Sequence, residues 1–322
     1  MSTVTFFTPV QEDIQEVEAF MRRQADDAHP EMKAALAHLL AAGGKRIRPT
    51  LVLLTGKMLG APHDKLVTLA AAIELLHTAT LVHDDLIDGS LLRRGNPTLN
   101  AQWSPAATVL TGDFTFARAA KLAADTDNLE LMKLFAETLA TIVNGELTQL
   151  FASKGFVSRE NYFERIYAKT GSLIKMCSQS AAMISPTGPE TLAAMENYGY
   201  HLGLAFQIVD DILDFTGDQS EIGKPVGSDL LQGLITLPAL NYIETHPDDP
   251  DVACLLGGNA LLDPERAERL VQSIRASQAI DLSLKEARQF IDQAIGYLAG
   301  MPAGIEKQAL EELARYTVSR RF

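Results

Sequence analysis

Apolar residues with helical spacing run through almost the whole chain. Val10, Ile14, Val17 and Met21 recur every three or four residues, and the same spacing returns between residues 66 and 80. Gly and Pro clusters separate these segments, and alternating strand-like runs are absent. Since 47% of the residues are hydrophobic, the chain can bury a sizeable core. The pattern predicts an all-α helical bundle.

The composition excludes two classes of protein. The apolar fraction is too high for a disordered chain. The 28 Lys and Arg against 41 Asp and Glu give a net charge of −13, and no basic stripe is available to neutralise nucleic-acid phosphates. No low-complexity linker divides the chain, so we expect a single helical domain over residues 1–322.

The chain has few features of a secreted or membrane protein. Two cysteines, Cys177 and Cys254, cannot build a disulfide framework and suit a reducing compartment. The N-terminus lacks the basic and apolar regions of a secretory signal. Glu74 and His77 interrupt the most apolar stretch before it reaches the ~18 residues of a membrane span. We therefore expect a soluble, cytoplasmic protein.

Two segments share the pattern DDxxD, each after an apolar helical stretch. They are LVHDDLID at 81–88 and QIVDDILD at 207–214. Their carboxylates belong to Asp84, Asp85, Asp88, Asp210, Asp211 and Asp214. At ~100° per residue, positions i, i+1 and i+4 span an arc of ~100°, so we expect each trio to project from one side of its helix. Three like charges beside a core repel one another and are costly to desolvate.

The repetition favours a metal site over a solvated acidic face. A solvated face would explain one such segment, but it would not require the same spacing twice. Carboxylate oxygens suit Mg²⁺, which usually keeps several waters and shares its remaining sites with substrate phosphates. We expect the two trios to hold several Mg²⁺ ions around one diphosphate, since the metal reverses the local charge.

The segment GGKRIRP at 43–49 is unusually basic for this acidic chain. Its two glycines are predicted to end one helix, and Pro49 is predicted as the first residue of the next. Arg48 would then lie at a helix start with Lys45 nearby, where backbone N–H groups and the helix dipole favour an anion. An ordinary basic loop is the alternative.

Further cations follow both aspartate segments. Arg93 and Arg94 lie just beyond the first, where they would either pair with its carboxylates or clamp phosphate oxygens. Lys169 and Lys224 are the others, the latter ten residues beyond Asp214. Together with the metal trios, these cations describe a site for two diphosphate substrates.

These motifs resemble those of the trans-polyprenyl diphosphate synthases. The resemblance covers residues 43–238 and rests on GGKRIRP, LVHDDLIDGSLLRRGNPT, KT, FQIVDDILDFTGD and GKPVGSDL. It implies a helical bundle around a deep central cavity, usually a homodimer. The implied reaction condenses isopentenyl diphosphate head-to-tail with an allylic diphosphate, releasing diphosphate and giving a linear all-trans polyprenyl diphosphate.

The resemblance also assigns roles to individual residues. Mg²⁺ would be ligated by Asp84, Asp85, Asp88, Asp210 and Asp214, with Asp211 in the same catalytic motif. The allylic diphosphate would be held by Arg93, Lys169, Thr170, Gln207 and Lys224, with Gln149 near a further allylic position. Isopentenyl diphosphate would be held by Lys45, Arg48, His77 and Arg94, with Phe206 over its hydrocarbon part.

One position departs from the family pattern. The family commonly has GKxTLP after the second aspartate segment, and Leu234 replaces that lysine in GLITLP at 233–238. One cation at the allylic diphosphate is therefore missing. We expect weaker allylic binding without loss of catalysis.

The resemblance implies a mechanism without a side-chain base. Metals and cations would stabilise the departing diphosphate, and the double bond of isopentenyl diphosphate would attack the allylic cation. In the family the released diphosphate is thought to accept the final proton. This would explain why the chain has no convincing nucleophile–base pair.

Two small residues predict the product length. Thr80 lies one turn before Asp84, and Ala79 lies beside it, ~6–8 Å along the helix from the metals. In the family, aromatic residues at these positions stop chain growth early. Ala79 and Thr80 thus imply a product of C30 to C50, unless a deeper side chain forms the floor.

Other functions remain open from the sequence alone. A short-chain synthase making C15 to C25 products would share every motif. A non-catalytic subunit often loses one aspartate segment, and a class I terpene cyclase normally has an Asn/Ser/Glu second motif, whereas this chain has two DDxxD segments. A phosphohydrolase metal pair at His83 and Asp84 would leave the second segment unexplained. A long apolar product also suggests peripheral contact with a membrane on release.

Overall fold

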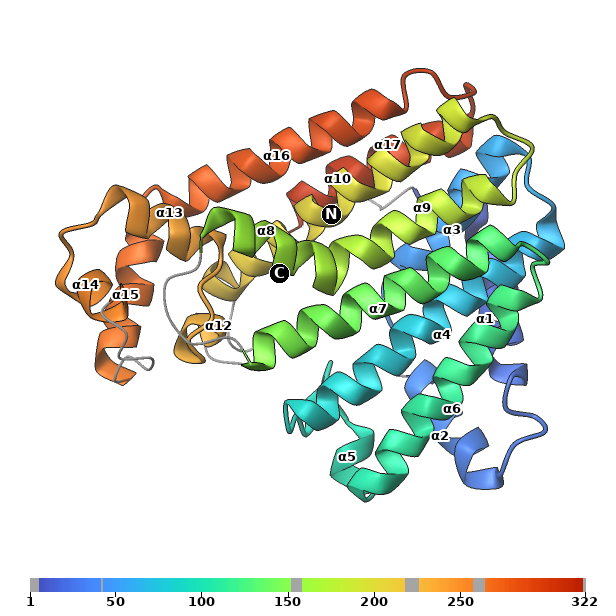
Figure 1. Cartoon of the computed structure of the whole chain (residues 1–322), viewed down its shortest axis with the longest axis horizontal. Helices are drawn as coiled ribbons and strands as arrows, with labels where there is room; N and C mark the ends of the chain where they lie inside the picture. The colour runs from blue at the N-terminus through green and yellow to red at the C-terminus, as the bar shows by residue number, and fades with distance from the viewer. Residues whose placement is uncertain (1–5, 42, 152–157, 218–225, 257–263, 321–322) are drawn as a thin grey trace. The chain divides into compact units, whose positions relative to one another are not determined.

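The computed structural model describes residues 6–41, 43–151, 158–217, 226–256 and 264–320, and nearly all its regular structure is helical (Figure 1). The helical elements are η1 (Thr8–Val10), α1 (Gln11–Arg23), α2 (Pro30–Ala41), α3 (Ile47–Leu59), α4 (His63–Ile87), α5 (Leu99–Gln102), α6 (Pro105–Ala124), α7 (Leu129–Phe151), α8 (Arg159–Ile166), η2 (Tyr167–Gly171), α9 (Ser172–Met183), α10 (Pro189–Thr216), α12 (Ser228–Leu231), α13 (Leu237–Thr245), α14 (Pro250–Leu256), α15 (Pro264–Ala276), α16 (Ala279–Tyr297) and α17 (Ile305–Ser319). The all-α prediction is confirmed.

The residues group into two compact units. Unit 1 comprises Met1–Glu137, Met176–Glu196 and Gly300–Glu312, and unit 2 comprises Thr138–Lys175, Asn197–Ala299 and Leu313–Phe322. Each unit therefore draws on distant parts of the sequence. The first aspartate segment belongs to unit 1 and the second to unit 2. The expectation of a single domain and of a deep central cavity stays a prediction.

Helix α4 forms the centre of unit 1. It packs against α6, α3 and α1, and it is apolar on nearly every side, as expected for a helix surrounded by others. Gly112 of α6 lets the two long helices approach closely, because a Cβ there would lie 2.1 Å from Nε2 of His83. His83 is thus a packing residue on α4. That it belongs to no phosphohydrolase metal pair stays a prediction.

Helix α4 is also long and apolar enough to cross a membrane, the only such helix in the part of the chain that the structure describes. However, 72% of its most apolar 18-residue window is buried inside the protein. That burial is typical of a core helix.

The basic segment between α2 and α3 differs slightly from its prediction. Helix α3 begins at Ile47, so Pro49 is its third residue and not its first. A proline is tolerated there because the first four N–H groups of a helix have no intrahelical partner. Arg46 precedes α3 in a left-handed conformation with φ 46°, and Arg48 lies in the first turn, as expected.

A short antiparallel hairpin follows α4, where only a loop was expected. Strands β1 (Leu92–Arg93) and β2 (Asn96–Pro97) pair with Arg93 opposite Asn96. The two turn residues, Arg94 and Gly95, both have positive φ, which is the geometry that joins tight hairpins. Two-residue strands are too short to leave an alternating pattern in the sequence, so periodicity did not reveal them.

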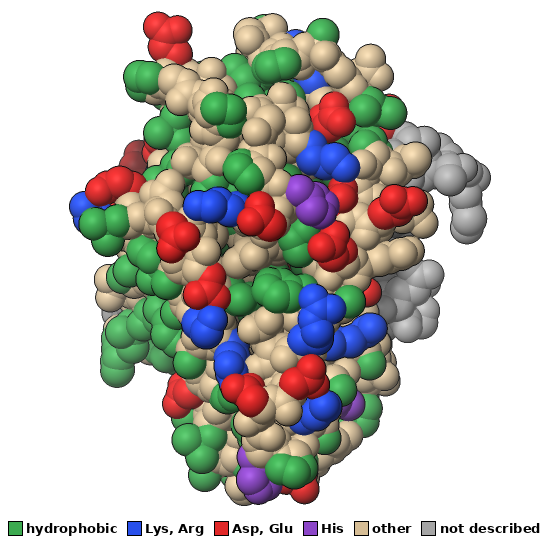
Figure 2. All heavy atoms as spheres, turned by 90° about the vertical axis from the view of Figure 1, so that its right-hand side faces the viewer, with side chains coloured by type: hydrophobic (Ala, Val, Ile, Leu, Met, Phe, Trp, Pro, Cys, Tyr) green, Lys and Arg blue, Asp and Glu red, His purple; other side chains and the backbone are tan. Residues whose placement is uncertain are grey.

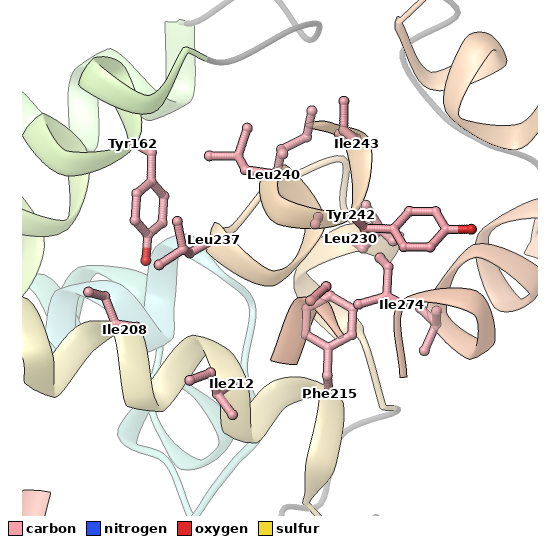
Figure 3. Packing of buried hydrophobic residues seen from close by; sticks show 14 of the residues in the cluster. Tyr162, Ile208, Ile212, Phe215, Leu230, Leu237, Leu240, Tyr242, Ile243 and Ile274 are labelled. Carbon is pink, nitrogen blue, oxygen red and sulfur yellow. The ribbon is translucent and has the colours of Figure 1, made fainter. Parts of the chain in front are cut away.

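The core of unit 2 forms against the C-terminal half of α10 (Figure 3). Buried side chains from α8, α10, α12, α13 and α15 meet there, among them Tyr162, Ile208, Ile212, Phe215, Leu230, Leu237, Leu240, Ile243 and Ile274. This packing buries one face of α10 near its C-terminal end, where the second aspartate segment lies. The core therefore fixes the position of the second DDxxD segment.

On the face shown in Figure 2, acidic and basic side chains are interspersed among apolar and neutral ones.

Candidate active site in two units

Both aspartate segments lie at the C-terminal ends of long helices. Asp84 and Asp85 are in the last turn of α4, and Asp88 is its C-cap. The second segment is in the last two turns of α10, which ends at Thr216. The C-terminus of a helix carries partial negative charge, so carboxylates are disfavoured there. The placement occurs at both helix ends, so cations are needed there to compensate the carboxylates.

In unit 1, the middle aspartate of the trio turns into the protein. Asp85 is buried, and its two oxygens accept hydrogen bonds from Nε of Arg93 at 2.9 Å each, with Nη2 of Arg93 at 2.8 Å from Oδ1. Asp84 is half-buried and Asp88 exposed, four residues apart and so on one face of the helix. Of the three carboxylates predicted to project together, Asp85 instead pairs with Arg93. Around the helix it lies ~100° from Asp84 and ~60° from Asp88.

The hairpin brings Arg94 to the basic segment at 43–48. Its Nη1 donates a hydrogen bond to the carbonyl of Gly43, and a Cβ on Gly44 would lie 2.6 Å from the same nitrogen. Only glycine at position 44 leaves room for this guanidinium. The structure thus places Arg94 beside the segment that carries Lys45 and Arg48, as their predicted shared role requires. Lys45 is exposed and Arg48 half-buried.

Arg46, between those two cations, has a structural role instead. Its guanidinium is held by Glu18 at 2.8 Å, by Glu74 at 2.9 Å and by the carbonyl of Leu40 at 3.1 Å. Burial opposes its charge, but the two carboxylates raise the pKa of Arg46 overall. This ion-pair network anchors the start of α3 and so fixes the backbone on which Lys45 and Arg48 are placed.

His77 lies on α4 among these cations. Burial lowers its pKa well below 6.5, and the positive charges of Arg48, Arg94, Arg93 and Arg46 lower it further. His77 is therefore neutral near pH 7, and its ring is available as a hydrogen-bonding group beside an anion site.

We expect this depressed pKa to appear in the pH dependence of stability. Below pH 6.5 the unfolded chain binds a proton at His77 that the folded chain does not, so stability falls as the pH falls from 6.5 towards 5. His77→Gln should lose less stability over that range than wild type, as measured by thermal unfolding at each pH. Parallel losses in the two proteins would contradict the assignment.

In unit 2, the middle aspartate is again the buried one. Asp211 accepts hydrogen bonds from the hydroxyl of Tyr162 at 2.7 Å and from Nε2 of Gln207 at 2.8 Å. Burial raises its pKa to about 7, although both hydrogen bonds favour the charged form. Asp214 accepts from the hydroxyl of Ser228 at 2.7 Å and from the N–H of Asp229 at 3.2 Å. The start of α12 is thereby tied to α10.

Two more predicted allylic residues meet in unit 2. The hydroxyl of Thr170 donates to Oε1 of Gln207 at 2.5 Å. Thr170 lies in η2, a π-helical turn between α8 and α9, and such turns occur frequently at functional sites. Lys169 beside it is exposed, with Nζ 3.5 Å from Oε1 of Glu146 on α7. Gln149 is half-buried one turn further along α7.

Arg320, near the C-terminus, was not anticipated from the sequence. Its Nη1 lies 3.0 Å from Oδ1 of Asp210, its Nη2 donates to the carbonyl of Phe206 at 3.1 Å, and its guanidinium carbon lies 4.0 Å from the centre of the Phe206 ring. Its side chain is only 6% exposed. The one available signal was the pair of adjacent arginines at 320–321 in an acidic chain, which by itself does not indicate a contact with residue 210.

The two i, i+4 carboxylate pairs fit a metal that arrives with its substrate. Within the described residues, no group of three or more His, Cys, Asp and Glu side chains is arranged to hold a metal ion. Asp84 with Asp88, and Asp210 with Asp214, nevertheless each present two carboxylates on one helix face. Mg²⁺ usually takes only one or two protein carboxylates and completes its shell with water and phosphate oxygens.

Three predicted residues remain: Lys224, Ala79 and Thr80. Lys224 lies outside the described residues. Ala79 is buried and Thr80 half-buried on α4, where the Thr80 hydroxyl donates to the carbonyl of His77 at 2.8 Å. The roles predicted for the individual site residues stay predictions.

Comparisons with known proteins point to one family. Residues 29–274 match the model of the polyprenyl synthetase family. The octaprenyl diphosphate synthase of Escherichia coli is 35% identical over 291 residues, covering 88% of each chain. A protein named heptaprenyl diphosphate synthase component 2, from Geobacillus stearothermophilus, is 34% identical over 323 residues, covering 100% of each chain.

The fold is also similar to that of a solved enzyme. The crystal structure of a polyprenyl synthase from Caulobacter crescentus, complexed with calcium and isoprenyl diphosphate, gives a TM-score of 0.91 at 35% identity. The alignment covers 99% of this chain and 98% of that one. That complex holds a divalent cation and an isoprenyl diphosphate together, which is the combination expected from the carboxylates and cations described above.

Proposed function

The chain belongs to the polyprenyl synthetase family and is a trans-prenyltransferase, and we propose that it uses Mg²⁺ to make a linear all-trans product of C30 to C50. Its substrates are isoprenyl diphosphates, and we propose isopentenyl diphosphate as the unit added to an allylic diphosphate. The observation that carries this proposal is the repeated DDxxD segment at a helix C-terminus. A second acidic helix end supplies further carboxylates for metal ions bound together with a diphosphate.

Each unit contributes a different set of charges to the reaction. In unit 1, Asp84 and Asp88 would hold metal, and Lys45, Arg48 and Arg94 would bind the diphosphate of the isopentenyl substrate beside a neutral His77. In unit 2, Asp210 and Asp214 would hold metal, and Lys169 would bind the allylic diphosphate. Bound Mg²⁺ supplies positive charge that stabilises the leaving diphosphate. Each set of cations would orient the diphosphate that it binds.

Two observations support the long product. Ala79 and Thr80 place no aromatic side chain on α4 in the turn before the first DDxxD segment. In addition, the curated relatives named above are called octaprenyl and heptaprenyl diphosphate synthases. Short-chain synthesis of C15 to C25 products is the alternative.

A diphosphate-release assay on the isolated chain tests the proposed reaction. We expect release that requires both isopentenyl diphosphate and an allylic diphosphate, stops on addition of EDTA and returns with Mg²⁺. Release from the allylic diphosphate alone would instead indicate a terpene cyclase.

One observation favours a second candidate, a subunit of a two-component synthase. The relative from Geobacillus stearothermophilus is named as one component of a synthase. Against this, both aspartate segments are intact in the present chain. Activity of the isolated chain would exclude this candidate, whereas activity only with a second protein would favour it.

We also propose that the protein forms a homodimer in the cytoplasm and contacts membranes peripherally when it releases product. In unit 2, α7 exposes Val143, Leu147 and Leu150, at 47%, 44% and 57%, with the spacing of one helix face. An apolar stripe of this kind supports contact with a second copy. The acidic composition and the two cysteines support the cytoplasmic location. A solution mass of twice 35.0 kDa would agree with the dimer.

Leu234 offers a gain-of-function test of the allylic site. Its N–H bonds the carbonyl of Asp229, whose own N–H bonds Asp214, so position 234 is connected to the second aspartate segment. We expect Leu234→Lys to lower the KM for the allylic diphosphate about fivefold, because one added charge interaction contributes roughly 1 kcal/mol. Steady-state kinetics with varied allylic substrate measure this. A KM that does not fall would contradict the role assigned to this position.

A further inference from the structure

A chain of hydrogen bonds leads from the core of unit 2 to the proposed allylic site. Tyr162 donates to Oδ2 of Asp211, Gln207 donates to Oδ1 of the same carboxylate, and Thr170 donates to the amide oxygen of Gln207. The three distances are 2.7, 2.8 and 2.5 Å. Figure 3 shows Tyr162 in the apolar cluster with its hydroxyl directed towards α10. We call Tyr162, Asp211, Gln207 and Thr170 the hydrogen-bond chain.

The local helix geometry aligns the members of this chain. On a regular helix, Tyr162 and Thr170 would be ~80° apart, at ~100° per residue over eight residues. The π-helical turn η2 inserts about one extra residue, which turns Thr170 back by ~100° and leaves the two side chains ~20° apart. On α10, Gln207 and Asp211 are four residues apart and share a face. The α8–η2 segment thus presents Tyr162 and Thr170 to the face of α10 that carries Gln207 and Asp211.

A pair of glycines brings these elements into contact. A Cβ on Gly203 of α10 would lie 2.7 Å from Cα and 2.9 Å from the carbonyl oxygen of Gly171, the last residue of η2. The backbones therefore meet one residue from Thr170 and four residues from Gln207. This close approach explains how a short Thr hydroxyl reaches the Gln207 amide.

The donor and acceptor directions within the hydrogen-bond chain determine which polar atoms remain available to the substrate. Asp211 accepts on both oxygens and is 4% exposed, so its carboxylate is used within the protein. Because Gln207 gives one amide hydrogen to Asp211 and accepts from Thr170, its second amide hydrogen is left to donate. The proton of the Thr170 hydroxyl is used in this chain, so its oxygen is left as an acceptor.

We infer that Tyr162 and Asp211 are positioning residues, which set the orientation of Gln207 and Thr170 towards the allylic substrate. This inference rests on the proposed function of those two residues at the allylic site. Tyr162 is 0% exposed, and its hydroxyl donates to Asp211, so its link to the allylic residues runs through that carboxylate. The guanidinium carbon of Arg165 lies over the Tyr162 ring, 5.6 Å from its centre.

The test compares two tyrosines in unit 2 that make the same kind of bond. Tyr242 donates to Oδ2 of Asp249 at 2.7 Å, equal to the distance from Tyr162 to Asp211, and its ring stacks on His246. Neither partner of Tyr242 is a predicted site residue. We expect Tyr162→Phe to lower kcat/KM for the allylic diphosphate by up to about tenfold, as loss of one buried hydrogen bond predicts. The KM for isopentenyl diphosphate and the Mg²⁺ concentration for half-maximal activity should change less than twofold. Tyr242→Phe should retain wild-type kinetics.

A double-mutant cycle separates positioning from a general structural effect. If Tyr162 acts through Thr170, then adding Tyr162→Phe to Thr170→Val should cause little further loss of activity. Effects that multiply, equal losses in Tyr162→Phe and Tyr242→Phe, or wild-type kinetics in Tyr162→Phe would each overturn the inference.

Binding of a thio-analogue of an allylic diphosphate, which does not react, provides a readout without turnover. Measured by calorimetry with Mg²⁺, its Kd should rise at least threefold in Tyr162→Phe and stay unchanged in Tyr242→Phe. If the wild-type chain binds the analogue but makes no product, the proposed reaction fails while this comparison still decides the positioning role. If the wild-type chain does not bind the analogue, both the proposed function and the inference are overturned.

Discussion

Asp88→Asn is expected to abolish most prenyltransferase activity while making the metal-free protein more stable. The residue is an exposed carboxylate at the C-cap of α4, where the helix dipole disfavours negative charge. Neutralising it should stabilise the fold by about 0.3–1 kcal/mol at low salt. The same change removes one proposed metal ligand, and we expect kcat/KM to fall at least about a hundredfold, equivalent to ~2.7 kcal/mol of transition-state stabilisation.

Asp64→Asn is the matched control at the other end of the same helix. Asp64 is exposed in the first turn of α4, where negative charge is favourable. Its replacement should lower stability by a similar amount and leave activity unchanged. Thermal unfolding in EDTA and steady-state kinetics in Mg²⁺ measure both variants. An active Asp88→Asn enzyme would contradict the proposed metal site, and a destabilised one would contradict the electrostatic explanation of its placement.

Thr80→Phe is expected to shorten the product from C30–C50 to C15–C25. Thr80 is half-buried one turn before Asp84, so an aromatic ring there would obstruct a product chain growing along α4 from the metal site. Ala79→Tyr should act in the same direction. Since Ala79 is only 2% exposed, that variant also overfills a packed position, at a cost of roughly 1–3 kcal/mol. Thr80→Phe is therefore the cleaner test.

Thr68→Phe provides the comparison. Thr68 is also half-buried on α4, and its hydroxyl also bonds a backbone carbonyl, that of Asp64. It lies ~18 Å further along the helix from the metal site than Thr80 does, at 1.5 Å per residue. Products of wild-type length from Thr68→Phe and shorter ones from Thr80→Phe would support the geometric argument. Unchanged product length in Thr80→Phe would contradict it.

The helical architecture could be predicted because its signal is repeated in every segment. The spacing of Val10, Val17 and Met21 predicts a buried helix face, and all three are buried in the structure. The hairpin around Arg94 and Gly95 could not be predicted from periodicity, because its strands have two residues each. It was nevertheless the element that carried both arginines back towards Asp85 and Gly43.

The predicted site residues were identified by chemistry, whereas their partners depend on tertiary structure. The DDxxD spacing indicated six carboxylates, but only the fold shows that Asp85 and Asp211 turn inwards to Arg93 and Tyr162. Tyr162 has the sequence environment of an ordinary core aromatic. Arg320 is separated from Asp210 by more than a hundred residues, and no local pattern records their contact.

Sizing the products of the purified chain by mass spectrometry tests the central claim most directly. The reaction would contain isopentenyl diphosphate, Mg²⁺ and geranyl, farnesyl or geranylgeranyl diphosphate. We expect linear products that increase in C5 steps to C30 or more and that disappear when EDTA is added. Products ending at C15 to C25 would retain the reaction but contradict the length assigned from Ala79 and Thr80. Cyclic hydrocarbons formed without consumption of isopentenyl diphosphate, or no condensation with any of the three primers, would contradict the proposed function.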